Sequence, residues 1–131
     1  MTDIICLDKK YSTTKLLSKK KTESLNIKND KFESFLFLPA TKDRIAEGGL
    51  RCEGYFKKSY VDKPLISIVT VVFNSEDYLE EAIKSVINQS YDNLEYIIID
   101  GGSTDGSLDI IKDYSSQLDY WISEKDKGVY D

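Results

Sequence analysis

Histidine is missing from this sequence of 131 residues, and only two cysteines are present. Without histidine, no Ser-His or Cys-His pair can activate a nucleophile. Cys6 and Cys52 lack the spacing of a metal site, so we expect free thiols in a reducing cytosol. No apolar run reaches the ~18 residues of a membrane span, and the first residues lack the apolar core of a secretory signal. These absences predict a cytoplasmic protein.

Charge is unevenly divided along the chain. Residues 1–63 carry 14 basic and 9 acidic side chains, whereas residues 64–131 carry 4 and 14. We therefore expect a loosely ordered N-terminal extension and linker over 1–63 and a folded domain over 64–131. The lysine cluster at positions 19–21 leaves open a peripheral contact with anionic lipid headgroups at the inner face of a membrane. Nucleic-acid binding is not expected, because no aromatic residues are interleaved with these lysines.

Residues 65–105 read as strand, helix, strand and turn. The β-branched run over 66–72 is dense enough to predict a strand buried on both faces of a parallel sheet. A second run covers 94–99, and about a dozen residues of helical pattern separate the two, as in a βαβ crossover. Apolar residues at helical spacing predict one buried stripe on that helix: Tyr78, Leu79, Ala82, Ile83, Val86 and Ile87.

Shorter patterns extend this prediction on both sides. A second amphipathic helix is expected around Leu108–Tyr114, and a third strand over 119–124. Before the first strand, residues 35–38 suggest a short strand, and residues 42–47 a turn of helix stopped by two glycines. The fold class is therefore α/β, a βαβαβ unit of parallel strands preceded by an irregular basic segment. Its open sheet edge invites self-association or completion by another chain.

The turn after the second strand, D-G-G-S-T-D-G, is the candidate site. Ligands of open α/β sheets bind beyond the carboxyl ends of the strands. Asp100 is expected to accept a hydrogen bond from a base or a sugar hydroxyl, although it could instead only stabilise the turn. Gly101 and Gly102 would let backbone N–H groups approach a flat or anionic ligand. Asp105 is expected to stabilise the turn and cap the following helix.

Two common nucleotide-binding motifs are missing. A dinucleotide-binding dehydrogenase needs G-x-G-x-x-G directly after its first strand, and the sequence there is Phe73-Asn74-Ser75-Glu76. No Walker loop is present either. The pattern thus indicates an α/β ligand site without naming the ligand.

Three stretches, SIVTVVFN, YLEEAIKSVINQSYDNLEYIIIDGGSTDGS and DYWISEKDKGVYD, closely resemble the start of family 2 glycosyltransferases. The resemblance covers residues 64–131 and implies part of a GT-A fold, which is Rossmann-like. It also implies an enzyme of polysaccharide biosynthesis that transfers a sugar from a nucleotide-sugar donor, with inversion at the anomeric carbon. A UDP-sugar is the favoured donor, and thymidine or guanosine nucleotides stay open.

By position, the resemblance implies several contacts with the nucleotide. Asp100 matches the acidic residue that typically contacts the base, and Gly101 stands where many members have a second aspartate. The complete set of implied nucleotide-binding residues is Thr70, Phe73, Asn74, Asp100, Gly102, Ser103 and Asp126.

The remaining machinery of the family lies further along its sequences. The complete enzyme is expected to use Mg²⁺ or Mn²⁺ at a D-x-D motif, a catalytic base, and a glycan or lipid-linked acceptor. We expect this chain to end before these motifs, to hold no metal ligand or catalytic residue, and to lack turnover by itself. Two alternatives are a non-catalytic module that binds nucleotide or pairs with another chain, and a remnant without function.

Overall fold

A computed structural model describes residues 4–19, 37–38 and 41–125 of the chain. They form one four-stranded sheet in the order β1-β4-β3-β2. Its strands are β1 Arg44–Gly48, β2 Ile66–Val72, β3 Leu94–Asp100 and β4 Tyr120–Glu124. The helices are α1 Glu76–Ile87 and α2 Ser107–Asp113, with short 3-10 turns η1 Leu50–Glu53 and η2 Ser115–Gln117.

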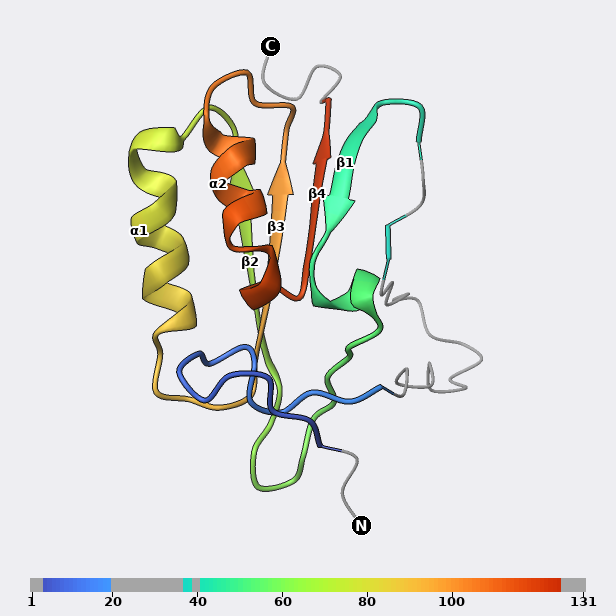
Figure 1. Cartoon of the computed structure of the whole chain (residues 1–131), viewed down its shortest axis with the longest axis vertical. Helices are drawn as coiled ribbons and strands as arrows, with labels where there is room; N and C mark the ends of the chain where they lie inside the picture. Colours follow the sequence, from blue (N-terminus) through green and yellow to red (C-terminus); the bar gives the residue numbers. More distant parts are fainter. Residues whose placement is uncertain (1–3, 20–36, 39–40, 126–131) are drawn as a thin grey trace.

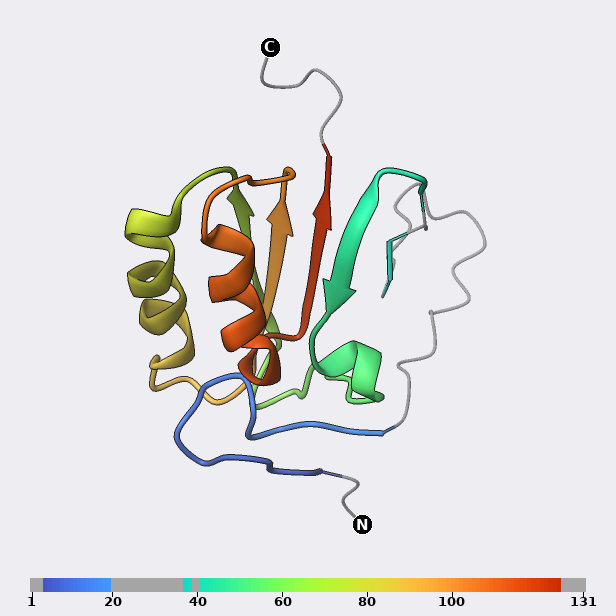
Figure 2. The same cartoon turned by 45° about the horizontal axis from the view of Figure 1, so that its top comes forward.

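The predicted parallel unit is confirmed. β2 pairs in parallel with β3 over all seven of its residues, and β3 pairs in parallel with β4. α1 connects β2 to β3, and α2 connects β3 to β4, so both crossovers contain a helix. Figures 1 and 2 show both helices on one face of the sheet. The described residues are therefore an α/β arrangement consistent with part of a GT-A fold.

The predicted turn of helix over residues 42–47 is wrong. Residues Arg44–Gly48 instead form strand β1, antiparallel to β4. The prediction used only the local residue pattern, whereas β1 is stabilised by pairing with β4, which lies more than 70 residues further along the chain. A side chain at Gly48 would meet the Trp121 indole at 2.7 Å, so the glycine read as a helix stop is needed for strand packing. The predicted strand over 35–38 lies partly outside the described residues, and Phe37 and Leu38 are not in a strand.

Residues before position 63 share the sheet and its hydrogen bonds. Before β1, the segment 4–19 contacts the carboxyl end of α1 and the start of β3. Ser12 N–H donates to Ile87 O at 2.8 Å, and Leu94 N–H donates to Ser12 O at 3.4 Å. Leu17 is fully buried. The division of the chain at residue 63 stays a prediction about its domain organisation.

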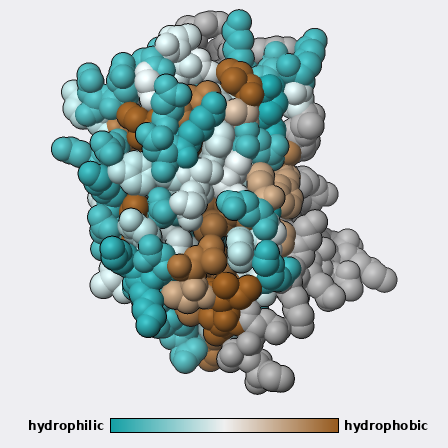
Figure 3. Space-filling model, viewed as in Figure 1, coloured by the Kyte–Doolittle hydropathy of each residue, from teal (hydrophilic) through white to brown (hydrophobic). Residues whose placement is uncertain are grey.

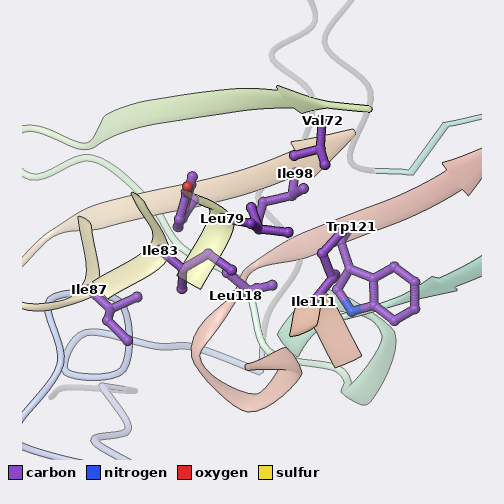
Figure 4. Packing of buried hydrophobic residues seen from close by; sticks show 9 residues of the cluster. Val72, Leu79, Ile83, Ile87, Ile98, Ile111, Leu118 and Trp121 are labelled. Carbon is purple, nitrogen blue, oxygen red and sulfur yellow. The ribbon is translucent and has the colours of Figure 1, made fainter. Parts of the chain in front are cut away.

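The core lies between the sheet and the two helices. Figure 4 shows its packed side chains, which come from α1, α2, the three parallel strands and the connection between η2 and β4: Val72, Leu79, Ile83, Ile87, Tyr96, Ile98, Ile111, Leu118 and Trp121. The stripe expected on α1 is confirmed in Leu79, Ile83 and Ile87, and Val86 is partly buried against them. Tyr78 and Ala82 are exposed, contrary to the prediction. Figure 3 shows mainly hydrophilic side chains over the outer surface of α1. α1 is thus an amphipathic helix whose inner face forms the core.

β2 is not buried on both faces, contrary to the prediction. Val69 and Val71 are 54% and 61% exposed, whereas Val72 is buried. β2 is an edge strand, and α1 and α2 cover only the face toward which Val72 points. Alternation of burial along β2 follows from the two-residue period of a strand.

Two buried ion pairs join η1 and the segment after it to residues of β3 and of the chain just before β4. Lys57 Nζ lies 2.6 Å from Asp119 Oδ1, with side chains that are 0% and 2% exposed. Lys57 Nζ also donates to Leu94 O at 2.6 Å. Arg51 pairs with Glu95, which also accepts from Ser67 Oγ. Burial lowers the pKa of Lys57 and raises that of Asp119, against the attraction between the two charges.

Candidate functional site

The carboxyl ends of β2, β3 and β4 meet at one edge of the sheet. Figure 1 shows this edge at the top, where the loop after β3 lies between the ends of the neighbouring strands. β1 runs in the opposite direction, so the residues just before Arg44 lie at the same edge. Lys125 N–H, directly after β4, donates to Asp43 O at 3.1 Å and joins these two segments. We refer to this region as the carboxyl edge.

Asn74 ties the end of β2 to the turn after β3. Its backbone adopts φ 46°, the left-handed region that asparagine tolerates better than most residues. Its Oδ1 accepts from Thr104 N–H at 2.8 Å and from Asp105 N–H at 3.3 Å, and its own N–H donates to Ser103 Oγ at 2.8 Å. The structure thereby brings together Asn74 and Ser103, two of the predicted site residues.

Asp105 caps both helices. Its Oδ2 accepts from Glu76 N–H at the start of α1 at 3.2 Å, and its Oδ1 accepts from Ser107 N–H at the start of α2 at 2.9 Å. Desolvation acts to raise the pKa of Asp105, but hydrogen bonds from Ser107 and Glu76 outweigh it and lower the pKa. The stabilising and capping role predicted for this residue is confirmed, and it extends to the first helix as well.

Asp100 is fully buried at the end of β3. Its Oδ2 accepts from Gly102 N–H at 3.2 Å, Ser103 N–H at 3.0 Å and Ser123 Oγ at 2.7 Å, and its Oδ1 accepts from Ser103 Oγ. The carboxylate therefore stabilises the turn and joins it to β4. This is the alternative role considered for Asp100, and direct contact with a ligand stays a prediction.

Backbone N–H groups of the turn are not directed at a ligand, contrary to the expectation. Gly101 N–H donates to Val72 O at 2.8 Å. The N–H groups of residues 102 and 103 donate to Asp100, and those of 104 and 105 donate to Asn74. All amides from 101 to 105 are thus satisfied within the chain. The glycines serve the tight geometry of the turn rather than an anion-binding nest.

Gly102 is needed for a close approach between the turn and the chain after β4. It adopts φ 87°, and a Cβ added there would meet Lys125 Cα at 3.0 Å. A side chain would be strained by both the backbone conformation and this contact.

We expect Gly102→Ala to lower the free energy of unfolding by about 1–3 kcal/mol. Gly54→Ala is the matched control, because Gly54 has φ 89° and its nearest neighbour to an added Cβ is the flexible end of Lys19 at 3.7 Å. Urea denaturation of both variants should show a larger loss at position 102. Equal losses of stability would mean that the contact with Lys125 adds nothing to the cost of placing alanine at a positive φ.

The other predicted residues lie apart from this network. The Thr70 hydroxyl shares a hydrogen bond of 2.9 Å with Tyr96 OH, whose ring is buried in the core. Phe73 follows β2 and is 43% exposed at the carboxyl edge. Asp126 lies outside the described residues. The roles of these three in binding nucleotide stay predictions.

Ser123 and Ser107 were missed by the sequence reasoning. Ser123 Oγ donates to Asp100, and Ser107 Oγ accepts from Ser75 N–H at 2.9 Å, with both serines fully buried. A polar residue in the middle of an apolar strand, as in W-I-S-E, is the signal that indicates Ser123. Ser107 carries no comparable signal, because it resembles any serine near the start of a helix.

No metal centre is found within residues 4–19, 37–38 and 41–125, where no group of three or more His, Cys, Asp or Glu is gathered. These residues therefore do not fit the divalent cation that the resemblance implies, and none is assigned to it. In the same part of the chain, each helix is too short or too polar to cross a membrane.

Comparison with known proteins identifies the parallel unit. Residues 67–129 match the sequence profile described as glycosyl transferase family 2. A glycosyltransferase of Haemophilus influenzae is 48% identical over 69 residues, which are 53% of this chain and 24% of that protein. A Bacillus subtilis glycosyltransferase, whose name assigns it to teichuronic acid biosynthesis, is 46% identical over 68 residues, or 52% and 25% of the two chains.

A Mycobacterium tuberculosis glycosyltransferase is 41% identical over 69 residues, which are 52% of this chain and 26% of that protein. The match thus spans about a quarter of the length of these relatives. The matched stretch begins inside β2 and contains α1, β3, α2, β4 and the whole turn around Asp100. The parallel strands and the family match agree, and residues 67–129 of this chain carry a glycosyl transferase family 2 domain sequence.

Proposed function

We propose that the chain holds the nucleotide-binding part of an enzyme that transfers a sugar from a nucleotide sugar to a glycan or lipid-linked acceptor. The observation that carries the proposal is the family match over a unit in which hydrogen bonds connect Asn74, Asp100 and Ser103 at the carboxyl edge. In open α/β sheets that edge is where ligands bind. The polysaccharide in the name of the Bacillus subtilis relative supports a glycan acceptor.

The proposed nucleotide site uses side chains in two different ways. Phe73 presents an exposed ring on which a base can stack, and the Asn74 side chain is exposed beside it. Asp100, Gly102 and Ser103 shape the turn that the nucleotide would face. The proposed set also includes Thr70 and Asp126 from the family resemblance. A uridine nucleotide is the first to test.

Calorimetric titration of the full chain with UDP-, TDP- and GDP-sugars, with and without Mn²⁺, tests the proposal. We expect heat of binding with one base. Phe73→Ala should weaken that binding about tenfold, in line with the loss of one stacking contact. Val61→Ala, fully exposed before β2, is the control and should bind as the unaltered chain does. Absence of heat with every donor would refute the proposal.

A non-catalytic module that is completed by another chain is the second candidate. It is favoured by β2, an edge strand in which Val69 and Val71 are half-exposed or more and no charged residue occurs. Sedimentation velocity distinguishes the two candidates. A stable stoichiometric complex with a second chain, without nucleotide binding, would favour the module, whereas a monomer that binds nucleotide would favour the donor site.

A further inference from the structure

A diphosphate at the carboxyl edge would need a source of positive charge. The backbone amides of residues 101–105 all donate within the chain, so they leave no N–H group for a phosphate. The carboxylates of Glu76, Asp100 and Asp105 lie at the same edge and would repel an anion. An opposing cation must therefore come from a side chain or from a bound ion.

Arg44 is the first cation to consider, but it is already paired. Its Nε lies 2.9 Å from Glu124 Oε1, and its Nη1 lies 3.2 Å from Glu47 Oε1. The guanidinium therefore offsets two carboxylates of the sheet, and its charge is not available for a ligand without breaking these pairs.

Lys125 is placed next to the turn. It follows β4 directly, its backbone is held by the hydrogen bond to Asp43 O, and its side chain is exposed. The position that a Cβ on Gly102 would take lies 3.0 Å from Lys125 Cα and 3.6 Å from Lys125 Cβ. Because Gly102 has no side chain, Lys125 can lie in contact with the turn. Among the ion pairs of the described residues, none includes Lys125.

We propose that Lys125 contacts the diphosphate of the nucleotide bound at the carboxyl edge. This inference depends on the proposed function and adds to it the residue that recognises the charged part of the donor. A flexible ammonium group acts on phosphate as a point charge and needs no fixed fork geometry, which suits an exposed lysine at the end of a strand. Its contribution should depend on the phosphates of the ligand and be independent of the base.

The test compares a nucleoside with its diphosphate. Uridine and UDP, thymidine and TDP, and guanosine and GDP are titrated into the full chain and into Lys125→Gln at low ionic strength. We expect the variant to lose about fivefold to twentyfold in affinity for the diphosphate that binds best, with no change for the matching nucleoside. Added salt should reduce the difference between the two proteins, because it screens an exposed charge.

Two further variants make the result specific. Lys112→Gln removes an exposed lysine from the last turn of α2, and it should bind as the unaltered chain does. Lys125→Arg keeps the charge and should retain most of the affinity for the diphosphate. Equal binding of the diphosphate by the unaltered chain and Lys125→Gln would overturn this inference alone. Failure of the unaltered chain to bind any nucleoside or diphosphate would overturn the proposed function together with it.

Discussion

Replacing Lys57 by methionine is expected to destabilise the fold by about 3–5 kcal/mol, the cost of leaving one buried charge without its partner. Lys57 and Asp119 are both buried, and the lysine also donates to Leu94 O. Its loss would leave the Asp119 carboxylate with Tyr96 N–H, 2.7 Å away, as its remaining donor. Urea denaturation followed by fluorescence of Trp121, the single tryptophan, measures the change.

Lys58→Met is the matched control, because Lys58 is the exposed neighbour of Lys57. It should change the free energy of unfolding by less than about 0.5 kcal/mol. The double variant Lys57→Met/Asp119→Leu should recover part of the loss, since it removes both charges from the interior. If Lys57→Met were as stable as Lys58→Met, the pair could not be holding the segment before β2 to the sheet.

Asp100→Ala is expected to cost about 3 kcal/mol or more. Two N–H groups and two hydroxyls donate to this buried carboxylate, and hydrogen bonds to a charged group each contribute about 1.5–3 kcal/mol. The alanine variant would leave these donors unpaired in the turn. It should also lose nucleotide affinity, because the turn that the nucleotide would face is no longer held.

Ser123→Ala is the control for this change, because it removes one of the donors and keeps the carboxylate. It should cost about 1.5–3 kcal/mol, the contribution of one hydrogen bond to a charged group. Comparison of the two variants separates the contribution of the hydrogen bonds within the turn from that of the hydrogen bond to β4. A loss for Asp100→Ala no greater than that for Ser123→Ala would mean that the bonds to Gly102 and Ser103 do not stabilise the turn.

The parallel strands and α1 could be predicted because their signals are local. β-branched runs mark β2 and β3, and apolar residues at helical spacing mark the face of α1 that contains Leu79, Ile83 and Ile87. Strand β1 could not be predicted in this way. R-I-A-E-G has no clear period, and only pairing with distant β4 makes it a strand.

The candidate site was predicted in position but only partly in detail. Chain order placed Asn74, Asp100 and Ser103 at one edge, because parallel strands end on the same side. The direction of each hydrogen bond was beyond the sequence. Whether Asp100 faces outward or toward Ser123 depends on the register of β3 against β4, and that register is a property of the folded sheet.

Strand β1 has a practical consequence for any shortened version of this protein. A recombinant product trimmed to the family match over 67–129 would lack β1 and both Arg51 and Lys57. Both outer strands of its sheet, β2 and β4, would then carry unpaired backbone hydrogen-bonding groups. Glu95 and Asp119 would also lose the cations with which they pair. Expression boundaries should therefore start upstream of Thr41, so that the protein keeps the strand that shields β4 from intermolecular pairing.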